Sequence, residues 1–200
     1  MVHQATSGGP ADEQLLRRAV GGDPAAFGTI VERYQDRLYN AAYRLLGSAE
    51  DARDVVQEAF LKAYAHLDRF GGRSSLYTWL FRITVNMGLS HRRKRKWERR
   101  TLPSPGQDQP DPLEGLVGRA DADPVGPLLS AETERIVQRA LQDLDPEHRA
   151  VVVLRDIQQF DYGEIAEVLK VPTGTVKSRL HRARLMLRDS LRPLLKDVPA

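Results

Sequence analysis

Apolar residues recur at helical spacing along most of the chain, and glycine, proline and short polar segments interrupt them. A minor helix is predicted over residues 12–20, and a long amphipathic helix is predicted from Pro24 to a C-cap at Gly47. Ser48 and the carboxylate three positions later predict the start of another helix, which runs to about residue 67. A further helix is predicted from Leu76 into a basic run that ends at residue 100. No segment alternates with a period of two, so the predicted fold class is all-α.

Residues 101–129 break the helical pattern, since they carry six of the twelve prolines, are acidic and have no apolar period. They are predicted to form a flexible, mostly extended linker. After this linker, Ser130 predicts the start of a helix, and Asp145 with Pro146 predicts the start of the next. The inward positions of that next helix are predicted to be Val151, Leu154 and Ile157. The chain should therefore consist of two small helical domains, residues 12–100 and residues 130–196.

The most specific pattern of the second domain lies between residues 161 and 188, where two short helices meet at a tight turn. Asp161 and Glu164 have the spacing of a capping box, and Pro172 prevents the first helix from continuing. Lys170 stands in the turn where glycine is usual, so a left-handed conformation there is predicted to cost about 1 kcal/mol. The arrangement is typical of a helix-turn-helix motif.

The second helix of this motif has one apolar and one basic face. Thr173 is predicted to be its N-cap, and the buried stripe is predicted to be Val176, Leu180, Ala183 and Leu187. Such a helix can enter a DNA major groove. The candidate DNA contacts are Thr173, Thr175, Lys177, Ser178, Arg179, His181 and Arg182. Arg182 is the preferred reader of a base edge and Lys177 the preferred phosphate contact, although a one-residue rotation would give the base to Ser178 or Arg179. An ordinary helical hairpin with a solvated basic face is the alternative.

Charge is strongly segregated along the chain, although the formal net charge is only +3 and the pI is about 9.3. Residues 91–100 and 173–196 are basic, and the segment between them is acidic. Two basic regions of this kind favour nucleic acid as a partner. The helix from Leu76 adds aromatic residues among its cations, which is how single strands are bound without a sequence requirement. The alternative is that Trp79 and Phe81 belong to the core and the basic run serves solubility.

Several classes of function are disfavoured by composition. The chain has no cysteine, which excludes disulfides, thiol catalysis and Cys-ligated zinc. The five histidines lack ligand spacing and are expected at the surface, so no metal and no cofactor is expected. No nucleophile motif or glycine-rich phosphate loop is present, and an enzyme is not expected. Neither an export signal nor a membrane span is visible, so a cytoplasmic protein without membrane insertion is expected.

Three segments of the chain resemble those of bacterial sigma factors of the extracytoplasmic-function (ECF) type, in the sigma-70 superfamily. They are SAEDARDVVQEAFLKAYAHLDRF, SSLYTWLFRITVNMGLSHRRKRKW and EIAEVLKVPTGTVKSRLHRARLML. The resemblance implies an RNA polymerase sigma factor that binds core polymerase, opens the minus-ten promoter element with its N-terminal domain and reads the minus-thirty-five element with the helix-turn-helix. It also implies that the linker runs through the polymerase. Many members of this family are held inactive by an anti-sigma factor, which makes such a protein a further expected partner.

The resemblance also assigns roles to residues of the first domain. The outer face of the helix at residues 51–67 reads as a solvated surface from its charges alone, but in such factors this helix grips the polymerase. The implied core-polymerase contacts are Asp51, Asp54, Gln57, Glu58, Leu61 and Lys62. The expected minus-ten DNA contacts are Phe70, Trp79, Arg82, Asn86, Arg92 and Arg93. Asn86 could instead bond to neighbouring backbone. A helix-turn-helix regulator that acts without core polymerase and a nonspecific RNA-binding module are the alternative functions.

Overall fold

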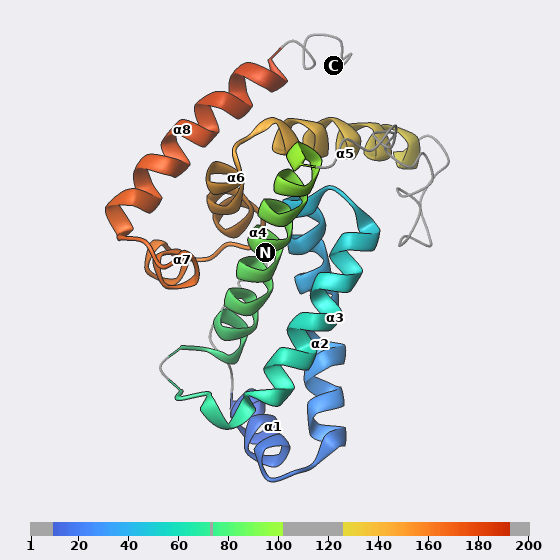
Figure 1. Cartoon of the computed structure of the whole chain (residues 1–200), viewed down its shortest axis with the longest axis vertical. Coiled ribbons are helices and arrows are strands. Elements are labelled where there is room, and N and C mark those ends of the chain that lie inside the picture. Colours follow the sequence, from blue (N-terminus) through green and yellow to red (C-terminus); the bar gives the residue numbers. More distant parts are fainter. Residues whose placement is uncertain (1–9, 73, 102–125, 193–200) are drawn as a thin grey trace.

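The computed structural model describes residues 10–72, 74–101 and 126–192, and this part of the chain is helical and contains no strand (Figure 1). The first unit comprises α1 (Pro10–Val20), α2 (Pro24–Leu46), α3 (Ala49–Ala65), the short 3₁₀ helix η1 (Leu67–Arg69) and α4 (Leu76–Thr101). The second comprises α5 (Gly126–Asp143), α6 (Pro146–Val152), the π-helical turn η2 (Val153–Ile157), α7 (Tyr162–Leu169) and α8 (Thr173–Leu191). The all-α prediction is confirmed. Residues 102–125 of the predicted linker lie outside the described residues.

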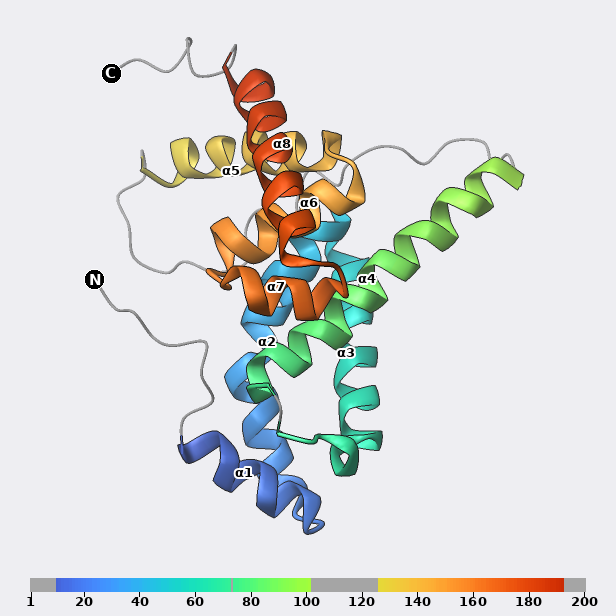
Figure 2. The ribbon, with the colours of Figure 1, turned by 90° about the vertical axis from the view of Figure 1, so that its left-hand side faces the viewer.

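The first unit is built on a hairpin of α2 and α3, across which α4 packs (Figures 1 and 2). Local signals define the hairpin: Asp23 accepts hydrogen bonds from the first backbone N–H groups of α2, and Gly47 ends α2 in a left-handed conformation with φ of 79°. Ser48 then caps α3 by accepting from the backbone N–H of Asp51. The core of this unit includes Ile30, Leu38, Ala41, Ala42, Ala59, Leu80 and Phe81. The predicted boundaries of this helix are therefore confirmed: Pro24 begins it, and Gly47 is its C-cap.

A buried carboxylate of α1 forms polar contacts with α2. Asp12 is only 6% exposed and accepts from both the Arg33 guanidinium and the Tyr34 hydroxyl. Burial and this carboxylate raise the pKa of Tyr34 above its ordinary value, so the phenol remains a proton donor to Asp12. The buried carboxylate of Asp12 is tolerated because each of its two oxygens accepts a hydrogen bond.

The second unit departs from prediction in two places. Helix α5 begins at Gly126, so Ser130 lies inside the helix and does not cap it. Helix α6 continues into η2, where the N–H of Gln158 bonds to the carbonyl of Val153, five residues back, at 2.9 Å. A π-helical turn holds one more residue than an α-helical turn, which shifts the inward stripe. Val151 and Leu154 are buried as predicted, but Ile157 is 38% exposed.

The helix-turn-helix has the predicted local geometry at its first helix and turn. The capping box between Asp161 and Glu164 is complete, with both reciprocal hydrogen bonds in place. Lys170 follows α7 in the left-handed region at φ of 54° and ψ of 47°, and its N–H bonds to the carbonyl of Ala166. Thr173, however, is the first residue of α8, and its predicted capping role is wrong because Pro172 occupies the N-cap without a side-chain bond.

The two units are in direct contact, which the sequence patterns did not predict. Helix α7 packs against α4, and α5 packs against α2 (Figures 1 and 2). At the first contact, the Tyr77 ring stacks on Phe160 with centroids 5.0 Å apart. Burial raises the pKa of the Tyr77 hydroxyl above its ordinary value, and this neutral group donates to Gln158 at 3.3 Å. The contact between the units is therefore apolar at its centre.

At the second contact, side chains of the second unit satisfy the C-terminal carbonyls of α2. Gln138 donates to the carbonyl of Tyr43 at 3.1 Å, and Gln142 donates to that of Arg44 at 3.2 Å. Arg149 is fully buried and donates to the carbonyl of Leu45 at 2.6 Å. The last carbonyls of a helix lack partners within the helix and carry partial negative charge, so a buried cation is favourable there.

Replacement of Gly47 by alanine is expected to lower the free energy of unfolding by about 1–2 kcal/mol. The left-handed backbone disfavours a Cβ, and that atom would lie 2.7 Å from the Gln142 side chain, which would have to leave its place at the α2 terminus. Gly28→Ala is the matched control: it lies inside α2 with no atom within 4 Å of a new Cβ, and should stabilise by about 0.5–1 kcal/mol. Urea denaturation of the full chain measures both, and equal stabilities of the two variants would contradict the expectation.

Candidate functional site

The outward face of α8 is the first candidate surface. Val176, Leu180 and Ala183 are buried as the apolar stripe, and Leu187 is partly buried, so the opposite side of the helix faces away from the body. The exposed candidates on that face are Thr173, Lys177, Ser178, His181 and Arg182, while Thr175 and Arg179 are half-buried. The structure therefore brings most of the predicted duplex contacts together on one accessible surface.

The cationic side chains of α8 differ in the groups that they contact. Arg179 forms an ion pair with Glu147 and is only 23% exposed, so its guanidinium is directed toward α6. The ammonium of Lys177 lies 5.7 Å from the ring centre of Tyr162. Within the described residues, neither an ion pair nor a side-chain hydrogen bond engages Arg182, whose donors remain available. This difference favours Arg182 over Arg179 as the base reader.

The second candidate surface is the side of α4 that carries Arg82 and Asn86. The guanidinium of Arg82 donates to the Glu167 carboxylate of α7 at 2.7 Å. The amide of Asn86 donates to the carbonyl of Arg82 at 2.7 Å and lies 3.5 Å from that of Val168. Asn86 thus makes the backbone bond that was its alternative role, and both side chains face the second unit.

The aromatic candidates separate into a partly exposed ring and a buried one. Trp79 is 8% exposed and belongs to the core, so the structure does not place it where a base could stack. Its ring packs edge-on against Phe70, with centroids 5.3 Å apart. Phe70 is partly buried at the end of η1, next to the loop that leads into α4. Trp79 is therefore a core residue that supports Phe70, which was the alternative prediction for it.

The basic run begins where α4 leaves the body of the molecule, and the far end of the helix projects from it (Figure 2). Arg92 donates to the carbonyl of Leu45 at 3.2 Å and so takes part in the contact at the α2 terminus. Arg93 is exposed and donates to Ser90 of its own helix at 3.2 Å. Only Arg93 of these two candidates therefore lies on the open surface.

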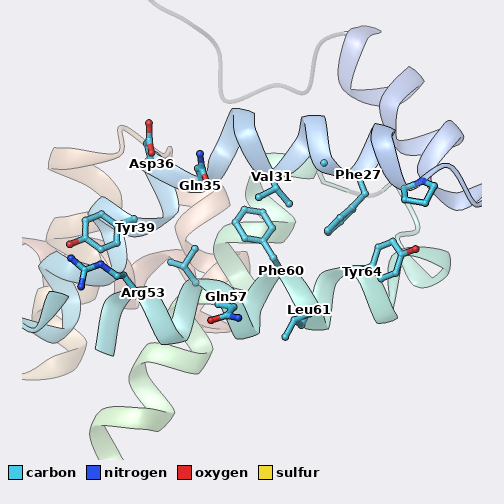
Figure 3. A pocket seen from close by; sticks show the side chains of 13 residues that line it. Phe27, Val31, Gln35, Asp36, Tyr39, Arg53, Gln57, Phe60, Leu61 and Tyr64 are labelled. Carbon is cyan, nitrogen blue, oxygen red and sulfur yellow. The ribbon is translucent and has the colours of Figure 1, made fainter. Parts of the chain in front are cut away.

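The third candidate surface is an apolar groove between α2 and α3, with a volume of about 780 Å³ (Figure 3). Phe27 and Val31 of α2 and Phe60, Leu61 and Tyr64 of α3 contribute its apolar lining. Leu61 is 63% exposed and Tyr64 is 49% exposed, so two large apolar side chains of the lining are open to solvent. Phe27 and Val31 follow the apolar period of the predicted helix from Pro24, and that period by itself did not indicate a groove.

Two of the predicted polymerase contacts line this groove, three are exposed elsewhere on α3, and one is engaged within the protein. Gln57 and Leu61 line it, and Asp54, Glu58 and Lys62 are exposed on the same helix. Asp51 is different, because its side chain is only 18% exposed and pairs with Arg95 of α4. That carboxylate ties α3 to α4, and the structure does not leave it free for a partner.

Neither a metal centre nor a membrane helix is found in the described ranges. No three histidine, aspartate or glutamate side chains there cluster as metal ligands would. No helix among those residues has both the length and the apolar character needed to cross a bilayer. Three histidines predicted at the surface, His66, His91 and His148, are partly buried.

Two family models match the chain, Sigma-70 region 2 over residues 30–98 and Sigma-70, region 4 over residues 134–187. The RNA polymerase sigma-H factor of Pseudomonas aeruginosa is 36% identical over 196 residues, covering 93% of this chain and 96% of the relative. The ECF RNA polymerase sigma factor SigW of Bacillus subtilis is 37% identical over 188 residues, covering 91% of this chain and 97% of the relative.

Solved structures agree with these relatives. CnrH, in complex with the cytosolic domain of CnrY, is 29% identical with a TM-score of 0.65, over 92% of this chain and 98% of that one. The sigma factor RpoE of Bartonella quintana, in complex with the anti-sigma factor NepR, is 27% identical with a TM-score of 0.66, over 83% of this chain and 96% of that one. Family models, relatives and solved structures agree, and the chain belongs to the ECF sigma factors of the sigma-70 family.

Proposed function

We propose that this sigma factor uses three separate faces: the groove of α2 and α3 for core RNA polymerase, the outer face of α8 for the minus-thirty-five duplex, and α4 with its preceding loop for the minus-ten strand. Sigma factors bind core polymerase and direct promoter-specific initiation of transcription, and they are not enzymes. The observation that carries this division is that α8 packs an apolar stripe against the body of the molecule and presents an exposed basic face on the other side. A cytoplasmic location suits these partners.

The polymerase face is supported by the exposed apolar side chains at the groove and by the exposed charged residues elsewhere on α3. Exposed Leu61 and Tyr64 border a groove, which is typical of the centre of a protein interface. Asp54, Glu58 and Lys62 on the same helix supply charges that can steer and orient a partner. Asp51 is omitted from this face because of its pairing with Arg95.

The duplex face is supported by the freedom of Arg182. An arginine can donate two parallel hydrogen bonds to guanine in the major groove, and it needs an unengaged guanidinium to do so. Lys177 is exposed on the same helix and is suited to a phosphate, which any sequence offers equally. His181 and Ser178 lie between them as further polar contacts.

The strand face is supported by the neighbourhood of Phe70, Arg82, Asn86 and Arg93. Taking a base out of the duplex costs a few kcal/mol, and a protein without a nucleotide motor recovers this only by binding the separated strand. Phe70 offers a ring, Arg82 and Arg93 offer cations for phosphate, and the Asn86 amide can both donate and accept at a base edge. The ring of Trp79 packs edge-on against Phe70 and supports its position.

Run-off transcription with purified core polymerase tests the proposal as a whole. Addition of the chain should produce a defined transcript from a promoter template, whereas a regulator that acts without core binding would produce none.

The structure of RpoE in complex with the anti-sigma factor NepR motivates the further proposal that an anti-sigma factor binds this chain. DNA recovered with the chain from cells would identify its promoters.

Replacing both Asp54 and Glu58 by lysine is expected to weaken binding to core polymerase at least about tenfold, because it reverses two charges at the rim of the interface. Both residues are exposed, so the fold should persist. Pull-down with core polymerase measures the loss, and circular dichroism reports helicity. Glu13→Lys with Asp143→Lys is the matched control, since these carboxylates are exposed on α1 and α5, outside the proposed face. If core polymerase retained the two double variants equally in the pull-down, the assignment of α3 to the polymerase face would be contradicted.

A further inference from the structure

The groove between α2 and α3 has the dimensions and the lining of a small-molecule site (Figure 3). Val56 and Phe60 are buried at the groove, so the lining is continuous with the core. At one end, the Phe27 ring lies 4.9 Å from that of Tyr64 and 6.4 Å from that of Phe60, centroid to centroid. The volume of about 780 Å³ falls within the range of about 300–1,000 Å³ that is typical of ligand pockets.

Gly28 keeps the wall of this groove open. It lies inside α2 and lines the groove, although glycine is the least favourable helix residue apart from proline. Its backbone does not have a positive φ, and a Cβ built on it would meet no atom within 4 Å. Neither the backbone conformation nor the packing therefore requires glycine here, and its effect is a gap that a side chain would fill.

The other end of the groove is polar and carries a cation that is not engaged. Arg53 of α3 and Tyr39 of α2 line this end, and Figure 3 shows their side chains pointing toward each other. Arg53 is exposed and has no ion pair among the described residues. Asp36 also lines this end, but its side chain points away from α3 (Figure 3). The guanidinium and the phenol hydroxyl are therefore hydrogen-bond donors available to an anionic group.

The distance between the apolar end and the polar end suits one acyl chain. Phe27 and Tyr39 are twelve residues apart on α2, which corresponds to about 18 Å at a rise of about 1.5 Å per residue. The acyl chains of one leaflet span about half of a bilayer core of about 30 Å, or about 15 Å. A hydrocarbon chain with a carboxylate at one end therefore matches both the length of the groove and the placing of its apolar and cationic side chains.

We propose that this groove is a binding site for a monomeric, single-chain fatty acid. The hydrocarbon chain lies along Phe27 and the gap at Gly28, and the carboxylate accepts from Arg53 and Tyr39. This site goes beyond the proposed function, which assigns no small molecule to the chain. A bound acid covers exposed Leu61 and so competes with core polymerase for the groove; that consequence rests on the proposed polymerase face.

Isothermal titration calorimetry of the full chain with sodium dodecanoate, kept below the concentration at which it forms micelles, tests the site. Saturable binding is expected. Sodium decanoate should bind about tenfold more weakly, because two methylene groups are no longer buried. Dodecyltrimethylammonium has the same chain with a cationic head group, and it should bind about fivefold more weakly than dodecanoate because Arg53 repels it.

Two variants place the ligand in the groove. Arg53→Glu should weaken dodecanoate binding about fivefold and strengthen binding of dodecyltrimethylammonium, since it reverses the charge at the polar end. Arg139→Glu is the matched control, because Arg139 is exposed on α5 and has no ion pair among the residues that the structure describes. Gly28→Leu should weaken both amphiphiles at least about tenfold by filling the gap. Thermal melting verifies that each variant is folded.

Equal dodecanoate affinities of the wild-type, Arg53→Glu and Gly28→Leu chains would overturn the proposal, because the acid would then associate with another surface. Equal affinities of the wild-type chain for the two head groups would overturn it as well, since the carboxylate would play no part. A pull-down with core polymerase separates this site from the proposed function. Release of polymerase at saturating dodecanoate supports both, whereas full retention with dodecanoate bound leaves the fatty-acid site standing and contradicts the groove as the polymerase face.

Discussion

Arg82→Ala is expected to reduce transcription from an ordinary duplex promoter by at least about tenfold, since a hydrogen bond to a charged group contributes about 1.5–3 kcal/mol. In the polymerase complex this guanidinium is proposed to hold a phosphate of the separated strand, which offsets the cost of unpairing. Asn86→Ala should also reduce transcription, because it removes the amide proposed to read a base edge. Run-off transcription with reconstituted holoenzyme measures both.

A promoter with a pre-melted bubble separates melting from base reading. Loss on the duplex with partial rescue on the bubble is expected for Arg82→Ala, whose phosphate contact stabilises opening. Loss on both templates is expected for Asn86→Ala, whose base contact is needed in either case. Arg17→Ala is the matched control, as this arginine is 72% exposed on α1 and, among the described residues, its side chain pairs with Glu13 alone. Wild-type rates for both α4 variants on the duplex would exclude strand capture by this helix.

Arg182→Ala is expected to cost about 1–3 kcal/mol of binding to the cognate minus-thirty-five duplex, a loss of about 5- to 150-fold, and to relax the preference at one base pair. Its guanidinium carries no ion pair among the described residues, so the loss should reflect the DNA contact alone. Lys177→Ala should weaken all sequences alike and lower the salt slope by about one, because it removes one phosphate contact. Fluorescence anisotropy at several salt concentrations distinguishes the two outcomes.

Arg188→Ala serves as the control for this pair, since Arg188 lies in the last turn of α8 and hydrogen-bonds to Asp189. It should change neither sequence preference nor salt slope. Equal losses for Arg182→Ala on cognate and scrambled duplexes would reject its base-reading role. In that case Ser178 becomes the next candidate, because Arg179 is engaged by Glu147.

Local rules were sufficient for the secondary structure and for the face of α8. Capping, glycine at a helix end and apolar periodicity act within one or two helical turns, so Gly47 and the Asp161–Glu164 box could be recognised from the residues alone. The exceptions have local causes that the apolar periodicity does not reveal. Ile157 turned outward because a π-helical turn interrupted the period, and Thr173 lost its capping role to Pro172.

The sequence by itself determined that the chain is helical, that it carries a helix-turn-helix with an open basic face, and that it resembles ECF sigma factors. Only the tertiary structure decided which candidate groups are free. Asp51 pairs with Arg95, 44 residues away, and Arg82 pairs with Glu167, 85 residues away. Such pairs depend on how whole helices pack, because a long charged side chain reaches whichever partner the fold brings within a few ångströms, and helical periodicity carries no information on that choice.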